Sequence, residues 1–432
     1  MSTGRSQKVK RRMELLQQVR IIDPAQQVDR FGDILLEGDQ IKSMGDRLTD
    51  YPAETTIIPS SGLILGTGLV DLYSHSGEPG NETRESLAEL AQAAANGGFT
   101  QVGILPDTVP PLDNLEVIAA LQHKSSLLHL SETQFNLPRL NFWGSAWNEE
   151  TKKMNGIGEL QSAIVGLVSS HHLGNLDIFR QILEYVQPWQ KTLAIALQPA
   201  QGVVREGAVS IRYGMSGNPG SSEAAAIAAI VEIAREIPHP VHLMRVSTER
   251  GVELIAEAKS RGINITASTT WMHLLWSDHA VGSYDPNLRL EPALGSESDR
   301  QSLSKGVKQG IIDAIAIDHQ AYTYEEKTVA FALAPPGVIG LEFALPLLWQ
   351  KFVATGEWSA LELWQALSSR PRQCLQQQVK AIAPAQAVDL VLFDSEKTWT
   401  CTQNHLKSPA ANTVWYDQEI TGKVIKTWTN NC

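Results

Sequence analysis

The 432-residue sequence predicts an α/β fold: a TIM-type (β/α)8 barrel plus a small β-sandwich-like domain formed by both termini. Three observations predict it. Short apolar segments alternate with amphipathic helical segments through the middle of the chain, which is typical of parallel strands joined by helices. Eight such units favour a closed barrel over an open sheet. Strand-and-turn patterns occupy the two ends.

The first and last parts of the chain show this pattern of short strands and turns. Near the start it appears in "QQVRIIDP", "FGDILLEGDQIKSMG" and "TTIIPSSG", and it returns in "AVDLVLFDSEKTWTCT" and "NTVWYDQEITGKVIKTWTN". We expect residues 1–66 and 383–432 to build one β domain together, and residues 67–382 to form the barrel.

Eight strands are predicted in the barrel, at 68–73, 100–105, 138–144, 163–168, 192–197, 241–246, 263–267 and 312–317. Helical segments fit between several of them, as in "RESLAELAQAAANGG", "SSEAAAIAAIVEIAREI" and "TERGVELIAEAKSRG". The carboxyl ends of barrel strands converge on one face, where barrel enzymes hold their active sites. The residues predicted to meet there are Tyr73, His75, Asp107, Ser169, His171, His172, Gln198, Arg245, His273 and Asp318.

Composition excludes several classes of partner. A net charge of −11 makes nucleic acid an unsuitable ligand. No window reaches the ~18 uninterrupted apolar residues of a membrane span. The basic start is not followed by the apolar core of a secretory signal, and the three cysteines, Cys374, Cys401 and Cys432, show no CxxC spacing. We therefore expect a cytoplasmic protein without a disulfide framework.

An ordered series of motifs resembles the dihydroorotase branch of the amidohydrolase superfamily. It includes "GLVDLYSHSGEPG", "AANGGFTQVGILPDTVPPLDN", "VSTERGVELIAEAKSRGINIT", "DAIAIDHQAY", "APPGVIGLE" and "AVDLVLFD". The resemblance implies a cyclic-amide hydrolase of pyrimidine biosynthesis, which interconverts dihydroorotate and carbamoyl-aspartate. It also implies one or two zinc ions that activate water, and an aspartate on strand eight that shuttles the proton.

The positions that carry this chemistry in the family differ here. The family's His-x-His on strand one reads Tyr73-Ser74-His75, and its bridging carboxylate near strand four is replaced by Ser169. The strand-five histidine corresponds approximately to Gln198 and the strand-six histidine to Arg245. His75 and the strand-eight Asp318 are kept, whereas Gly77 and Asp107 stand where the family binds the substrate carboxylate. Asp389 and Glu223 match the family and are interpreted as scaffold.

These substitutions predict a site without its usual metal. Two unit charges ~4 Å apart interact by ~4 kcal/mol at an effective dielectric of ~20, so a divalent ion facing Arg245 would be repelled about twice as strongly. Catalytic zinc normally has about three protein ligands. No cofactor is expected, and we expect Arg245 to pair with Asp318 in place of the metal.

Three functions are consistent with this sequence. The first is a non-catalytic homologue acting as a structural or regulatory partner. The resemblance implies aspartate carbamoyltransferase as that partner, because inactive dihydroorotase-like subunits of the family assemble with it. The second is an active hydrolase with a zinc site rebuilt from His75, Asp318 and either His171 or His172, with Asp318 as general base. The third is a small-molecule binding module that uses the old pocket. We interpret His273 as local packing and expect a protein partner or self-association.

Overall fold

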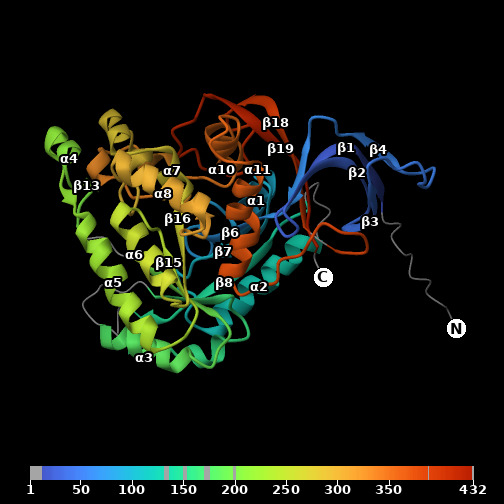
Figure 1. The fold of residues 1–432 in the computed structure, drawn as a ribbon. Helices are drawn as coiled ribbons and strands as arrows, with labels where there is room; N and C mark the ends of the chain where they lie inside the picture. The colour runs from blue at the N-terminus through green and yellow to red at the C-terminus, as the bar shows by residue number, and fades with distance from the viewer. Residues whose placement is uncertain are drawn as a thin grey trace.

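The structure is a computed structural model that describes residues 12–130, 136–148, 153–169, 176–197, 201–387 and 389–430. It contains an eight-stranded parallel sheet and a seven-stranded mixed sheet (Figure 1). The N-terminal strands of the seven-stranded sheet, drawn in blue, lie to one side of the helix-covered barrel (Figure 1).

The eight parallel strands form a nearly closed barrel. Their order follows the chain: β6 (Leu69–Ser74), β7 (Phe99–Ile104), β8 (Arg139–Ser145), β11 (Gly166–Ser169), β12 (Thr192–Ala196), β15 (Val241–Met244), β16 (Ile265–Thr270) and β17 (Ala314–Ala316). The segment after β17 returns to the end of β6, where Asp318 N–H donates to the Tyr73 carbonyl at 3.1 Å and His75 N–H donates to the His319 carbonyl at 2.8 Å. The predicted eight-unit barrel is confirmed.

Helices pack around this sheet. Those of eight residues or more are α1 (Leu87–Asn96), α2 (Leu115–Leu130), α3 (Leu176–Val186), α5 (Gly220–Glu236), α6 (Glu249–Ser260) and α8 (Glu297–Gln309). Shorter ones are α4 (Ala208–Tyr213), α7 (Trp271–Leu275), α9 (Tyr324–Lys327), α10 (Ala344–Leu348), α11 (Ala360–Trp364) and α12 (Arg370–Cys374). The sequence specifies their starts: Ser86 and Glu89 form a capping box on α1, and the Thr248 hydroxyl accepts from Gly251 N–H at the start of α6.

The seven-stranded sheet combines both ends of the chain. Its order is β19 (Glu419–Trp428), β18 (Leu390–Thr400), β5 (Ile64–Thr67), β1 (Met13–Asp23), β2 (Val28–Glu37) and β3 (Gln40–Gly45), with β4 (Thr56–Pro59) paired to β1. A β domain built from both termini is therefore present, while the division at residues 66 and 382 remains a prediction. Two short two-stranded sheets add β9 (Trp147–Asn148) with β10 (Lys153–Met154), and β13 (Val204–Arg205) with β14 (Gly217–Asn218).

A salt-bridge cluster joins the two sheets. Asp389, just before β18, accepts hydrogen bonds from Arg139 at the start of β8 and from Arg372 in α12, and its carbonyl accepts from Gly68 N–H at 2.7 Å. This cluster lies at the amino ends of the barrel strands, so the carboxyl ends remain open for a site.

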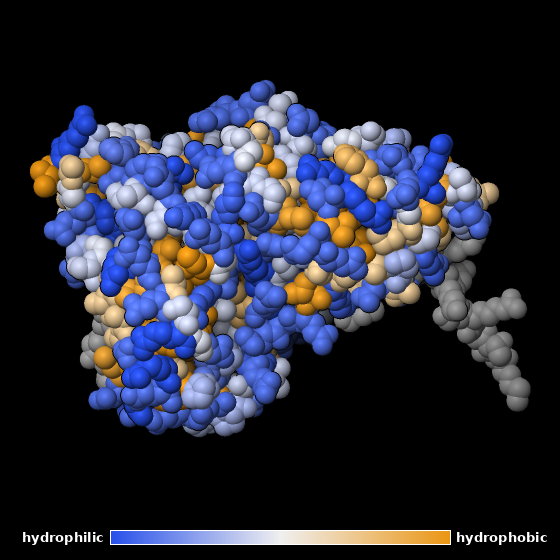
Figure 2. Space-filling model, viewed as in Figure 1, coloured by the Kyte–Doolittle hydropathy of each residue, from blue (hydrophilic) through white to orange (hydrophobic). Residues whose placement is uncertain are grey.

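The visible surface is largely hydrophilic, with smaller apolar areas between charged side chains (Figure 2). In the described ranges, no helix has both the length and the apolar character needed to cross a membrane.

Candidate functional site

A cavity of about 600 Å³ opens at the carboxyl ends of the barrel strands. Its walls are largely apolar, with Leu105, Met244, Trp271, Ile317 and Val338 among the lining residues. Seven charged or titratable side chains line it, and four of them lie close together: His75 after β6, Asp107 after β7, Arg245 after β15 and Asp318 after β17. The barrel topology thus brings together residues that are up to 243 positions apart (318 − 75).

Arg245 and Asp318 form a bidentate ion pair. The Arg245 Nε–H donates to Asp318 Oδ2 at 2.7 Å, and Nη2–H donates to Oδ1 at 2.6 Å. Both side chains are only 15% exposed, so the pair is largely removed from solvent. Burial alone would raise the pKa of Asp318, but the guanidinium and His75 hold it well below its usual range. The expected contact between these residues is present.

Tyr73 fixes the backbone of both partners. Arg245 and Asp318 adopt left-handed conformations, with φ of 58° and 51°. Arg245 N–H donates to the Tyr73 hydroxyl at 3.0 Å, and Asp318 N–H donates to the Tyr73 carbonyl at 3.1 Å. Such φ values are uncommon outside glycine and persist where surrounding contacts impose them. One fully buried tyrosine therefore aims the guanidinium at the carboxylate.

A chain of polar groups continues below Tyr73 into the barrel. The Tyr73 hydroxyl lies 2.9 Å from Ser268 Oγ, and Ser268 Oγ lies 2.9 Å from His242 Nε2. The other ring nitrogen of His242 is 2.9 Å from Thr266 Oγ1. Burial lowers the pKa of His242 to about 3, so this imidazole is neutral. The chain satisfies the buried hydroxyl of Tyr73 without a charge.

His75 connects the ion pair to Asp107. Its Nδ1 is 2.5 Å from Asp107 Oδ2, and its Nε2 is 3.1 Å from Arg245 Nη2 and 3.4 Å from Asp318 Oδ1. In the neutral ring Nε2 accepts from the guanidinium, whereas in the imidazolium it faces Asp318. Burial opposes protonation, but the carboxylates of Asp107 and Asp318 outweigh it and raise the pKa of His75 to about 9.

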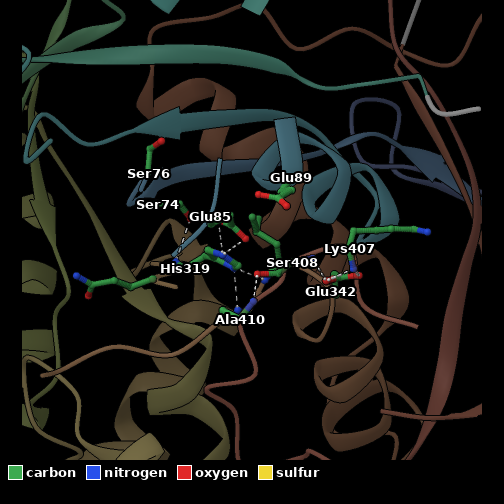
Figure 3. A network of polar contacts seen from close by, with 12 residues as sticks. Ser74, Ser76, Glu85, Glu89, His319, Glu342, Lys407, Ser408 and Ala410 are labelled. Carbon is green, nitrogen blue, oxygen red and sulfur yellow. Dashed lines mark hydrogen bonds and ion pairs between the residues drawn. The ribbon is translucent and has the colours of Figure 1, made fainter. Parts of the chain in front are cut away.

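The residue after Asp318 points away from the cavity. Figure 3 shows His319 within a polar network that includes Glu85 and Ser74. His319 Nδ1 accepts from Gly340 N–H at 3.1 Å, so its proton is on Nε2, which lies 3.1 Å from Glu85 Oε2. His319 N–H donates to Ser74 Oγ at 3.0 Å. This buried network fixes the loop that carries Asp318.

These residues do not fit a zinc ion. A guanidinium lies within hydrogen-bonding distance of His75 and Asp318, the two ligands that the resemblance predicts, and a cation cannot serve as a ligand. Within the ranges that the structure describes, no group of three or more His, Cys, Asp or Glu side chains could hold a metal ion. His171, His172 and Gln198 lie outside those ranges, so their predicted roles remain predictions.

Other predicted site residues lie beside the cavity rather than on its wall. Tyr73 is inside the barrel, and Ser169 is fully buried at the end of β11. A Cβ atom added to Gly77 would lie 2.4 Å from the Glu85 carbonyl oxygen, so the backbone leaves no room for a side chain there. His273 does line the cavity; its Nδ1 is 2.8 Å from Thr270 Oγ1, and burial lowers its pKa to about 4.

Sequence reasoning did not identify Ser268, His242 or Asp71. Asp71 is fully buried; its Oδ1 accepts from Ile317 N–H at 2.8 Å and its Oδ2 from the Ser74 hydroxyl at 2.5 Å. Burial raises the pKa of Asp71 to about 7. A signal was available, because a carboxylate within the apolar strand "GLVDLY" has to be hydrogen-bonded.

The fold and the site's position at the mouth of the barrel define an amidohydrolase-type barrel with an additional β domain. L-hydantoinase from Arthrobacter aurescens superposes with a TM-score of 0.82 at 19% identity, covering 96% of this chain and 94% of that one. Dihydropyrimidinase from Brevibacillus agri superposes with a TM-score of 0.76 at 17% identity, covering 96% and 94%. At these identities the likeness establishes the fold alone.

Sequence relatives establish the family. The chain is 39% identical to a probable dihydroorotase-like protein of Synechocystis sp., covering 94% of this chain and 98% of the relative. It is 31% identical to the dihydroorotase of Pelobacter propionicus, covering 96% and 97%. Comparison with family models gave no match. The chain belongs to the dihydroorotase family.

Replacing Arg245 with alanine tests the ion pair. The substitution leaves Asp318 buried without its main partner, so we expect unfolding stability to fall by ~3–5 kcal/mol, measured by urea denaturation at pH 7. Arg250→Ala is the matched control, because Arg250 is 61% exposed and pairs with the exposed Glu253. Its loss should cost at most ~1 kcal/mol. Equal effects of the two substitutions would contradict a buried, stabilising pair.

The protonation of His75 predicts a pH dependence of stability. Its folded pKa of about 9 lies above the reference value of ~6.5. The imidazolium therefore contributes stability that is complete below pH ~6.5 and is lost as pH rises through about 9. Thermal unfolding between pH 6 and pH 10 should show this fall, and His75→Gln should reduce it. His123 is exposed, so His123→Gln serves as the control. If stability falls with pH in His75→Gln as much as in the wild type, groups other than His75 cause the fall.

Proposed function

We propose that this chain is a non-catalytic member of the dihydroorotase family, a cytoplasmic protein that acts as a structural or regulatory partner of another protein. The bidentate pair between Arg245 and Asp318 is the observation that carries the proposal. The guanidinium supplies the positive charge that a metal ion would bring, but it offers no coordination position for water.

The same pair weakens Asp318 as a base. Both carboxylate oxygens accept hydrogen bonds from Arg245, and the pKa of Asp318 is held well below its usual range. An efficient general base has a pKa near the working pH. A divalent cation approaching Asp318 would meet the guanidinium, with a repulsion about twice the ~4 kcal/mol of two unit charges at ~4 Å. Proton transfer and metal binding are both disfavoured.

Recognition of an anionic substrate is weakened in the same way. Gly77 has no side chain to bind a carboxylate, and the surrounding backbone excludes one. Asp107 lies at the mouth with 51% of its side chain exposed. A dihydroorotate carboxylate would therefore meet another carboxylate where a cation is needed. The weakened base and the weakened carboxylate binding both support a non-catalytic role.

A retained fold with an altered site suits a scaffolding role. Aspartate carbamoyltransferase is the partner implied by the resemblance to inactive dihydroorotase-like subunits, which would connect the chain to pyrimidine biosynthesis. Self-association is the alternative.

A second candidate, a small-molecule binding module, is favoured by the cavity of about 600 Å³. This volume lies within the ~300–1,000 Å³ of typical ligand sites. Such a ligand would raise the thermal unfolding midpoint without being turned over.

Elemental analysis together with a dihydroorotate hydrolysis assay tests the catalytic part of the proposal. We expect less than stoichiometric zinc or manganese in the purified full chain, and no turnover in either direction after incubation with either metal. The dihydroorotase of Pelobacter propionicus, at 31% identity, is the positive control. One bound metal per chain together with turnover would instead support an active hydrolase with a rebuilt site.

Size-exclusion chromatography with light scattering tests the partner. Mixed with aspartate carbamoyltransferase from the same organism, the full chain should co-elute at a mass above that of either protein alone. The Pelobacter propionicus dihydroorotase is the mixing control. Separate elution at micromolar concentrations, with a mass unchanged from each protein alone, would exclude this enzyme as the partner.

A further inference from the structure

A second cavity, of about 180 Å³, lies at the amino-terminal end of the barrel, opposite the mouth. Its walls come from the start of β8, from α12 with the segments on either side of it, and from the seven-stranded sheet at the end of β5 and beside β18 and β19. The polar residues that line it are Thr67, Arg139, Ser368, Arg372, Lys380, Asp389 and Asn430. It shares no lining residue with the cavity at the mouth.

Cations outnumber anions in this cavity. Arg139, Arg372 and Lys380 line it, and Asp389 is the single acidic residue among its described lining residues. Arg372 has a side chain only 14% exposed, and burial lowers its pKa despite the neighbouring carboxylate. Among the described lining residues, Arg139 and Arg372 against Asp389 leave one excess positive charge in a partly buried place, which is unfavourable, and the exposed Lys380 adds a second.

Asp389 has no acceptor capacity left to reduce this excess. It accepts from Arg139 Nη1–H at 3.2 Å and Nη2–H at 2.5 Å, from Arg372 Nη2–H at 2.9 Å, and from Asn430 N–H at 2.9 Å. A carboxylate offers about four lone-pair positions, and all are used. The Lys380 ammonium donates to the Ala387 carbonyl at 3.2 Å, which provides no opposite charge.

We propose that this cavity binds a phosphate group. Two guanidinium groups and an ammonium converge on it from β8, from α12 and from the segment after α12, and a phosphate dianion matches the excess charge. Guanidinium donors suit phosphate oxygens, and lysine adds a compact positive charge. The cavity is smaller than the ~300 Å³ of typical organic-ligand sites. It therefore accommodates inorganic phosphate or the phosphate of a monoester whose remainder lies in solvent.

The position of this cavity indicates how a bound phosphate would affect the structure. Arg139 and Arg372 already connect the barrel to the strand β18 through Asp389. An anion between these cations would strengthen the junction of the two sheets without touching the mouth. This proposal is independent of the proposed function.

Titration calorimetry and thermal unfolding of the full chain test the site, with inorganic phosphate compared with chloride at equal ionic strength. We expect phosphate to bind and to raise the unfolding midpoint of the wild-type chain. Lys380→Gln removes an exposed cation that makes one hydrogen bond to a carbonyl, so the chain should fold and its phosphate affinity should fall about tenfold. Lys397→Gln, an exposed lysine on β18 outside the cavity, should bind like wild type.

Two further experiments locate the bound anion and distinguish free phosphate from a phosphate monoester. Tungstate soaked into crystals of the full chain should give anomalous density between Arg139, Arg372 and Lys380. Binding of inorganic phosphate alone indicates a free-ion site, and binding of phenyl phosphate indicates that a monoester is accepted. No binding of either probe, an affinity unchanged in Lys380→Gln, or tungstate found only elsewhere would overturn the proposal.

Discussion

The contact between Arg245 and Asp318 determines the chemistry of the barrel mouth. Because the guanidinium uses both carboxylate oxygens and also approaches His75, one side chain contacts both residues that the resemblance predicts as metal ligands. The site is internally neutralised: Arg245 with Asp318, and His75 with Asp107. These four charges therefore offset one another, whereas Asp113 and Glu291, which also line the cavity, add negative charge.

Much of the fold could be predicted because a barrel strand is short, apolar and regularly spaced. The predicted and observed strands differ where a strand buries polar residues instead of apolar ones. A strand was expected at 263–267, but β16 runs over Ile265–Thr270 and includes buried polar residues such as Ser268. The Ser268 hydroxyl finds partners in Tyr73 and His242 inside the barrel, and no local pattern indicates such partners.

The sequence predicted one central contact of the candidate site and missed others. The pairing of Arg245 with Asp318 followed from charge, because a buried carboxylate without a metal needs another cation. The role of Tyr73 did not follow from the sequence. It depends on β6 lying next to the segment after β17 and within reach of the residue after β15, a relation that only the closed barrel provides. The crowding at Gly77 likewise comes from a loop whose path the sequence does not specify.

Tyr73 also links the effects of substitutions at positions 73 and 245. Its hydroxyl accepts the backbone N–H of Arg245, so a histidine substituted at position 73 would lose this contact while the guanidinium still faced Asp318. Histidine placed at position 245 alone would remove the bidentate counter-ion and leave Asp318 with His75 as its nearest cation. Positions 73 and 245 are therefore interdependent: either substitution made alone removes a contact to Arg245 or Asp318 and supplies no replacement for it.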